Sequence, residues 1–185
     1  MSESDRDGAG PFRGTCELVL GADHLDRVVQ RGLRRARADL ALATSDLKAM
    51  LVPGRRKGRS RSVLEILREL AERGVEVRLL HASLPSGPAR DFLAAPLPET
   101  MALRCCPRVH TKAVIVDAAA MYLGSANLTG AGLGAKADHR RNFEAGIWTE
   151  EPELIDPVLE WFDQLWEGVF CPGCGRRRHC PAPLG

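Results

Sequence analysis

The sequence predicts an α/β layered domain, because short apolar runs of strand type alternate with segments of helical periodicity. The chain has 185 residues, enough for one domain with a hydrophobic core and too few for two ordinary catalytic domains. Its longest apolar stretches are interrupted at Asp117 and fall far short of the ~20 residues that span a bilayer, so we expect no membrane span. The expected organisation is a disordered leader over 1–13, one folded domain over 14–169 and a cysteine-rich tail over 170–185.

The first expected elements are one strand and one helix. Residues 17–20 form a short apolar run that is typical of a strand. Asp23 is a candidate N-cap, and the apolar residues between Leu25 and Ala36 recur at helical spacing after it. The sequence therefore predicts a strand followed by a helix in this segment.

A second strand and helix come next. An apolar strand over 39–44 leads into a basic loop at 53–58, which proline and glycine mark. Ser62 and Glu65 have the spacing of a capping box, the following apolar residues lie on one helical face, and Gly74 ends the helix.

The second half of the chain is richer in strands. Residues 75–81 alternate as a strand, and the Pro- and Gly-rich stretch 85–98 predicts a loop with one short helix around Asp91. A terminal helix is expected to begin near Pro152 or Pro157. The further strands are expected at 101–105, 113–117, 121–124 and 143–148.

The formal net charge of +2 conceals two basic runs, one in the loop after the second strand and one in the tail. A net charge this small does not by itself indicate a nucleic-acid partner. Each run is either a solvated loop or a phosphate-binding surface. The acidic N-terminus has no apolar signal core, so we expect a cytoplasmic protein. The candidate substrate-binding residues are Arg55, Arg56, Lys57, Arg176, Arg177 and Arg178.

One segment carries the strongest chemical signal. It reads HxKxxxxD, from His110 through Lys112 to Asp117, and is followed by GSxN, which contains Ser125 and Asn127. Residues two apart on a strand point to one face, so the His110 imidazole and the Lys112 ammonium can address the same phosphate. Neutral imidazole can attack phosphorus, and Ser125 and Asn127 can add neutral hydrogen-bond donors. These residues predict a phosphate site that needs no metal or other cofactor for catalysis.

In residue types and spacing, this motif resembles that of the phospholipase D superfamily. Asn142 and Glu144 resemble the asparagine-x-glutamate element that follows the motif in many members. The resemblance covers residues 14–169 and implies a mixed central β-sheet flanked by helices. It also implies that His110 forms a phosphohistidine and that Glu144 holds its other ring nitrogen. Asp117 is either catalytic or a structural residue that pairs with a basic group. The candidate catalytic residues are His110, Lys112, Asp117, Ser125, Asn127 and Glu144.

The chain carries the motif once. The family chemistry uses one histidine as nucleophile and a second to protonate the leaving oxygen. No other histidine is followed by lysine two positions later, and those histidines are His24, His81, His139 and His179. The resemblance therefore implies a homodimer in which a symmetric partner supplies the second His110.

The tail contains three of the six cysteines, and Cys171 and Cys174 form a CPxCG knuckle whose spacing suits zinc. Adjacent ligands in so short a loop are geometrically awkward, so Cys105, Cys106 or another chain could replace part of the set. A zinc ion with four protein ligands would be structural. The alternative is a flexible tail with reactive thiols. The candidate metal ligands are Cys171, Cys174, His179 and Cys180.

The motif recognises a phosphodiester and leaves the substrate class open. Short single-motif members resemble bacterial endonucleases and restriction-type nucleases, and the chain has two arginine-rich loops and no acyl-sized insertion. We therefore favour a nuclease that acts on DNA or RNA. A restriction or antiphage defence system, with a helicase or another defence protein as partner, is the biological setting that we expect. The alternatives are a phospholipase or phosphatidyltransferase, and a noncatalytic nucleic-acid-binding or assembly subunit.

Overall fold

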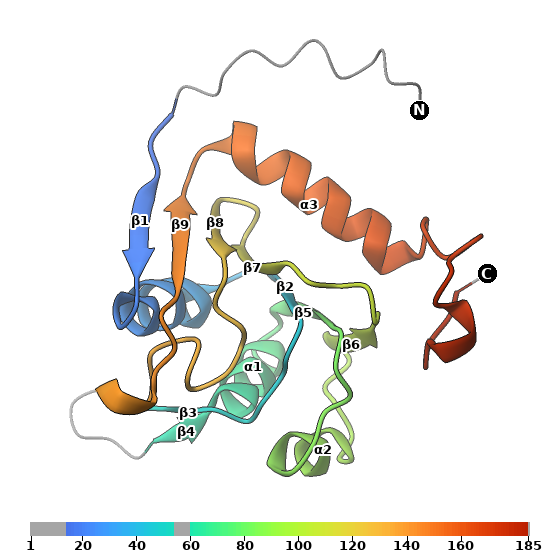
Figure 1. Cartoon of the computed structure of the whole chain (residues 1–185), viewed down its shortest axis with the longest axis horizontal. Helices are drawn as coiled ribbons and strands as arrows, with labels where there is room; N and C mark the ends of the chain where they lie inside the picture. The colour runs from blue at the N-terminus through green and yellow to red at the C-terminus, as the bar shows by residue number, and fades with distance from the viewer. Residues whose placement is uncertain (1–13, 54–59, 185) are drawn as a thin grey trace.

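The computed structural model describes residues 14–53 and 60–184, and its centre is a seven-stranded sheet (Figure 1). The strand order is β1-β9-β8-β7-β2-β5-β6. The neighbours β2, β5 and β6 run parallel, and the pairs on the other side of β2 are antiparallel. The predicted mixed sheet is therefore confirmed. Its strands are β1 (Glu17–Leu20), β2 (Asp39–Thr44), β5 (Glu76–His81), β6 (Met101–Cys105), β7 (Lys112–Val116), β8 (Ala120–Gly124) and β9 (Ala145–Thr149).

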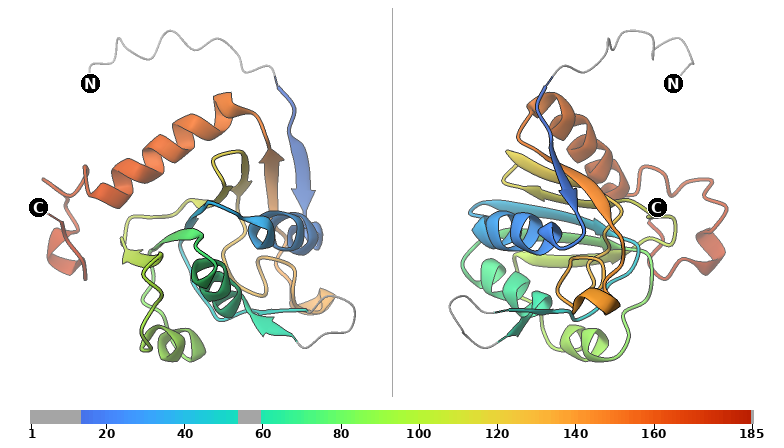
Figure 2. Two further views of the ribbon diagram at one scale, coloured as in Figure 1. Left: turned by 180° about the vertical axis from the view of Figure 1, so that it is seen from behind. Right: turned by 60° about the vertical axis from the view of Figure 1, so that its left-hand side comes forward.

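Helices cover both faces of this sheet (Figure 2). One face packs against η2 (Leu25–Gly32), a segment of wide π-type turns, and against α1 (Val63–Glu72). The opposite face packs against α3 (Pro152–Glu167), whose Ile155 and Phe162 are buried there. The remaining elements are η3 (Leu33–Arg35), β3 (Leu51–Val52), β4 (Arg61–Ser62), α2 (Pro88–Leu93), η5 (Asp138–Arg140) and η6 (Arg177–His179).

Strand β2 shows how the sequence builds two layers. All of its residues from Leu40 to Thr44 are buried. Leu40 and Leu42 belong to the larger core under α1 and η2, whereas Ala41 and Ala43 belong to the smaller core under α3. A strand buried on both faces reads as a continuous apolar run, which is why 39–44 could be recognised without alternation.

The predicted helix boundaries are accurate where a local signal sets them. At α1 the Ser62 hydroxyl accepts from the Leu64 N–H at 3.2 Å, and the Ser62 N–H donates to Glu65 at 2.8 Å, so the capping box is confirmed. Helix α3 begins at Pro152 and continues through Pro157, which stands in its second turn. Pro157 therefore does not mark the start of this helix.

The helix predicted between Leu25 and Ala36 is divided at Gly32. A Cβ atom built on Gly32 would lie 2.5 Å from the Trp148 ring, so this glycine lets the indole of β9 approach the helix backbone. The chain changes from η2 to η3 at this position, because tertiary packing takes precedence over regular helical periodicity.

Two sequence expectations lie outside the described residues. These are the disordered leader over 1–13 and the basic residues Arg55, Arg56 and Lys57. In the part of the chain that the structure does describe, no helix combines the length and the apolar character needed to cross a membrane.

Candidate active site

The topology brings four chain segments to one end of the sheet. Strand β7 is antiparallel to both β2 and β8, with Ala43 opposite Ala113 and Lys112 opposite Gly124. Gly124 in turn pairs with Gly146 of β9. Four segments therefore meet at this end of the sheet: the start of β7, the ends of β2 and β8, and the start of β9. His110, Lys112, Ser125, Asn127 and Glu144 all belong to these segments.

His110 and Lys112 lie together at this end of the sheet and are the candidate reactive pair. The His110 side chain is exposed, whereas Lys112 is 8% exposed and lies at the first position of β7. Lys112 Nζ donates to the His110 backbone oxygen at 2.7 Å and lies 3.4 Å from Nδ1 and 3.5 Å from Nε2 of the imidazole. One buried ammonium thus holds the His110 backbone and places a positive charge beside the ring. A charge with so little water around it acts strongly on a nearby phosphate oxygen.

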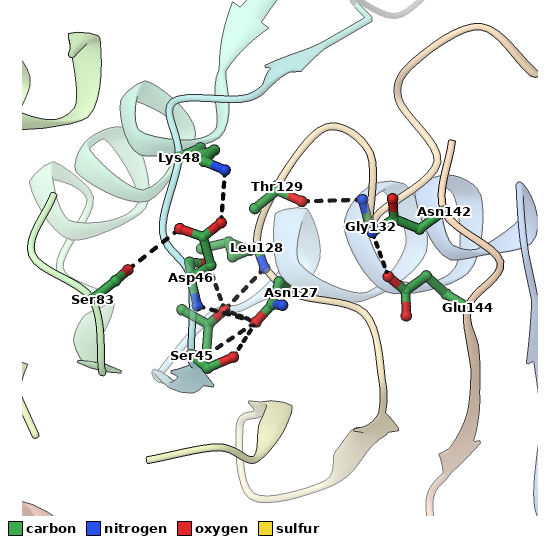
Figure 3. Close-up of polar contacts among 11 residues, drawn as sticks. Ser45, Asp46, Lys48, Ser83, Asn127, Leu128, Thr129, Gly132, Asn142 and Glu144 are labelled. Carbon is green, nitrogen blue, oxygen red and sulfur yellow. Dashed lines mark hydrogen bonds and ion pairs between the residues drawn. The ribbon is translucent and has the colours of Figure 1, made fainter. Parts of the chain in front are cut away.

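Asn127 is held by the turn that follows β2 (Figure 3). Its Oδ1 accepts from the backbone N–H groups of Ser45 and Asp46, each at 3.1 Å, and from Ser45 Oγ at 2.8 Å. Backbone N–H groups only donate, so Oδ1 must face this turn and Nδ2 must face away from it. Among the described residues no acceptor is bonded to Nδ2, which leaves this amide able to donate to a phosphate oxygen.

Ser125 and Glu144 form a second pair. Ser125 Oγ donates to the Glu144 carboxylate and accepts from the Ala145 N–H at 3.1 Å. The other carboxylate oxygen accepts from Asn142 Nδ2 at 3.0 Å (Figure 3). Within the described residues Glu144 is hydrogen-bonded to no histidine. Its expected role of holding the His110 ring stays a prediction, and in this chain it orients Ser125.

A buried pair that sequence reasoning missed supports the loop between Ser125 and Asn127. His24 Nδ1 lies 2.9 Å from the Gly21 carbonyl, so this nitrogen carries the proton and Nε2 is free to accept. Tyr122 OH donates to Nε2 at 2.9 Å and accepts from the Ala126 N–H at 3.2 Å. Burial raises the pKa of Tyr122 to about 12, which keeps the phenol protonated. No local pattern marks this pair, because 98 residues separate its members.

The glycine of the GSxN motif is explained by the same tyrosine. A Cβ atom on Gly124 would lie 2.4 Å from Tyr122 OH and 2.6 Å from the Gly146 Cα. Gly146 has the matching restriction, since its Cβ would lie 2.4 Å from the Tyr122 ring. Both glycines therefore provide the space that lets Tyr122 reach the loop.

Asp117 is not brought to this site. It follows β7 at the opposite end from His110, and its φ of 52° is in the left-handed region. Its carboxylate accepts from the N–H groups of Arg37 at 3.0 Å, Ala38 at 2.8 Å and Asp39 at 3.1 Å. Burial opposes its ionisation, but these hydrogen bonds prevail and lower the pKa of Asp117. These contacts favour the structural alternative for Asp117, whose hydrogen-bond donors are backbone amides, and its catalytic role stays a prediction.

The tail lies against the segment that leads into His110. Arg176 Nη1 donates to the Pro107 carbonyl at 2.7 Å, whereas Arg178 is exposed and Arg177 Nη1 donates to the Leu184 carbonyl at 2.8 Å. The predicted ligands Cys171, Cys174, His179 and Cys180 do not form a metal site as they stand. In the described ranges, no three His, Cys, Asp or Glu side chains are arranged to hold a metal ion.

A comparison with protein families matches residues 32–166 to the family described as "Cardiolipin synthase, PLD-like domain". The matched segment includes β2, the complete HxKxxxxD and GSxN motifs, and Glu144. The chain belongs to the phospholipase D superfamily. A comparison of this phospholipase D-like chain with curated proteins gives no match.

Solved structures share the phospholipase D-like fold of this chain. NucT from Helicobacter pylori superposes with a TM-score of 0.63 at 15% identity, covering 83% of this chain and 96% of NucT. Nuc from Salmonella typhimurium, a phospholipase D family member, gives 0.59 at 20% identity, covering 82% and 93%. TrmBL2, an archaeal chromatin protein, gives 0.53 at 15% identity, covering 83% of this chain and 53% of TrmBL2. The phospholipase D-like fold that the motif implies is thereby confirmed.

Proposed function

We propose that this phospholipase D-like chain is a metal-independent phosphodiesterase that cleaves nucleic acid through a phosphohistidine on His110. The observation that carries the proposal is the pairing of the exposed His110 imidazole with the buried ammonium of Lys112. Asn127 Nδ2 is presented at the same end of the sheet. The nucleophile is accessible, and the groups that would stabilise phosphate charge are fixed by the protein. Such preorganised donors are the main source of electrostatic catalysis.

The proposed reaction has two steps. Neutral His110 attacks phosphorus, a P–N bond forms, and the P–O bond to the leaving alcohol breaks. A second, protonated imidazole donates its proton to the leaving oxygen and then accepts a proton from the water that hydrolyses the P–N bond. Lys112 and Asn127 would stabilise the nonbridging oxygens in both steps. The products are an alcohol and a phosphate monoester, and both histidines return to their starting states.

A second copy of the chain is the proposed source of the second imidazole. His110 is exposed in the single chain and so is available to a symmetric partner. In a twofold dimer, each protomer would contribute the same His110, Lys112 and Asn127 to one shared site. The proposed enzyme is therefore a homodimer with one active site for two chains.

Nucleic acid is the favoured substrate because the arginine-rich tail is bonded to the segment that leads into His110. Arg176 is bonded to Pro107, three positions before His110, and Arg178 extends into solvent from the same turn. Arginine side chains in such a position can contact the phosphates on either side of the scissile one. The fold is also shared with TrmBL2, whose structure is described as showing a novel mode of DNA binding. The defence setting and a helicase partner stay predictions from the sequence.

A second candidate function is headgroup hydrolysis or transfer on phospholipids. The description of the matching family as a cardiolipin synthase domain favours it. The chemistry at His110 would be the same, since the substrate phosphodiester is the same group. Release of headgroup from anionic phospholipid vesicles, lost in His110→Ala, would select this function over nucleic-acid cleavage.

The test of the proposed function is cleavage of labelled single- and double-stranded DNA and RNA in excess EDTA. We expect cleavage by the wild type and none by His110→Ala. Purified mixed dimers of wild type and His110→Ala should also be inactive, because the shared site needs both histidines. Mixed dimers with half the wild-type rate would instead show two independent sites. Nucleic-acid binding without cleavage by a folded wild-type dimer would overturn the proposal in favour of a noncatalytic subunit.

A further inference from the structure

Four cysteines from distant parts of the chain line one cavity. Cys106 follows β6, and the other three, Cys171, Cys174 and Cys180, come from the C-terminal tail. The cavity has a volume of about 200 Å³ and lies between the segment before His110, the end of α3 and the tail. All six cysteines of the chain are described, and none is in a disulfide. The fold has therefore brought tail thiols to a thiol of the main domain.

The CPxCG turn within this cavity is prepared to hold a thiolate. Gly173 has a φ of +72°, which allows the tight turn in which the Cys174 N–H donates to the Cys171 carbonyl at 3.2 Å. The Arg108 guanidinium donates to Cys174 Sγ at 3.8 Å and places a positive charge beside this sulfur. A metal ion binds cysteine in its thiolate form, so this environment favours a metal ligand.

The cavity also distinguishes between the candidate fourth ligands. His179 is exposed in η6 and is not among the residues that line the cavity. Cys105 is the last residue of β6, its thiol donates to the Ala82 carbonyl at 3.5 Å, and it is not among the residues that line the cavity. Cys106 lines the cavity together with Cys174. Cys106, in place of His179, completes a four-cysteine set.

We propose that Cys106, Cys171, Cys174 and Cys180 bind one structural zinc ion, which fastens the tail to the segment that leads into His110. Four thiolates in a tetrahedron form a closed site with no position for water. In the described part of the chain these four thiols do not yet converge on one point. Closing the site requires side-chain rotation and an inward movement of the tail around the ion.

The charges around the cavity suit such a centre. Four thiolates and one Zn²⁺ carry a net charge of about −2, which needs nearby cations in a partly apolar setting. Arg108 and Arg176 both line the cavity, and Arg176 is already bonded to Pro107, the neighbour of Cys106. The zinc ion would therefore strengthen an existing attachment of the tail. It would also keep Arg176 bonded to the segment that leads into His110.

The test uses the full chain, zinc salts and four single variants. We expect about one tightly bound zinc ion per wild-type chain by elemental analysis, and a thiolate-to-cobalt charge-transfer band when Co²⁺ replaces it. Cys106→Ser and Cys174→Ser should lose the ion and the band, and their melting temperatures should no longer respond to a chelator. Cys16→Ser, at an exposed cysteine that does not line the cavity, and His179→Ala are the matched controls and should retain both.

A second readout covers the case in which a cysteine variant does not fold. Alkylation of the wild type, mapped by mass spectrometry, should be slowed by zinc at Cys106 and at the three tail cysteines, and not at Cys16. Absence of zinc from the reconstituted wild type would overturn the proposal. So would loss of zinc in His179→Ala with retention in Cys106→Ser, which would restore the ligand set confined to the tail. Neither result depends on whether the enzyme cuts nucleic acid.

Discussion

The two ends of β7 contain residues of one sequence motif in two different physical settings. At its start, which we call the reactive end, His110 is exposed, and the buried Lys112 ammonium lies beside its ring. At its other end, which we call the anchoring end, the Asp117 carboxylate accepts hydrogen bonds from three backbone N–H groups and fixes the turn before β2. The reactive end leaves an imidazole and an ammonium available to a ligand. At the anchoring end, the carboxylate makes its hydrogen bonds within the protein. Residues that recur together in a motif therefore need not act together.

The largest expected effect is that of His110→Ala, at the reactive end. We expect phosphodiester cleavage to fall by at least ~10⁴-fold, because each shared site loses both its nucleophile and its general acid. The melting temperature should stay close to that of the wild type, since the imidazole is exposed. Single-turnover rates and thermal unfolding measure the two quantities. Cleavage within tenfold of the wild type would contradict the assignment of His110.

Lys112→Met tests the charge beside the nucleophile. The change keeps the length of the side chain and removes the ammonium that lies 3.4 Å from His110 Nδ1. We expect the cleavage rate constant to fall by about 10²–10³-fold, as for loss of one preorganised donor in other enzymes. A larger effect on the rate constant than on KM would indicate stabilisation of the transition state. An effect on KM alone would assign Lys112 to substrate binding.

Asp117→Ala tests the anchoring end and should affect a different quantity. Loss of the charge-assisted hydrogen bonds to the 37–39 backbone should lower the free energy of unfolding by about 2–3 kcal/mol. The cleavage rate per folded dimer should remain within about threefold of the wild type, because Asp117 lies at the other end of β7. Urea unfolding and activity at a temperature where the variant is folded provide the comparison. A loss of rate as large as that of Lys112→Met would return Asp117 to the catalytic set.

Gly124→Ala tests how closely the reactive end depends on packing. The added methyl group would meet Tyr122 OH and the Gly146 backbone, so we expect a loss of stability of about 1–3 kcal/mol. A reduced cleavage rate should accompany it, since Tyr122 supports the Ser125 loop. Gly130→Ala is the matched control, because the nearest atoms to its new Cβ are 3.6 Å away. Equal effects of the two variants would show that the Tyr122 contact is unimportant.

The smallest expected effect is a pH dependence at the anchoring end. The pKa of Asp117 is lower in the folded chain than its ordinary value, so its stabilisation is present above about pH 4 and is lost as the pH falls through the folded value. The stability advantage of the wild type over Asp117→Asn should therefore be constant near neutral pH and shrink in acid. Denaturant unfolding between neutral and acidic pH measures it.

Asp39→Asn provides a control of opposite sign at the same end of β7. Burial, and then the nearby Asp117 carboxylate, raise the pKa of Asp39. At pH values above those at which Asp39 titrates, its ionised form therefore lowers the stability of the folded chain. Asp39→Asn should gain stability relative to the wild type as the pH rises from acid towards neutral. If both variants showed the same pH trend, the local electrostatic explanation would be wrong.

The sequence by itself determined most of the elements of this chain and its candidate reactive pair. Apolar runs located the strands of the main sheet, Ser62 and Glu65 placed the start of α1, and the spacing of His110 and Lys112 pointed to the candidate reactive pair. These signals are local, because helix caps and strand periodicity depend on residues only a few positions apart. The two-residue spacing of the reactive pair also predicted that both side chains point to one face of a strand.

Only the tertiary structure decided which distant groups support that pair. It assigned the Asn127 Oδ1 acceptor to the turn after β2, joined Tyr122 to His24, and moved Asp117 to the anchoring end. It also placed Cys106 in one cavity with the tail cysteines. These relations follow from the strand order β8-β7-β2 and from the docking of the tail, and neither leaves a periodic trace in the sequence. Partners that fold back from tens of residues away are selected by packing of the whole chain, which local patterns do not encode.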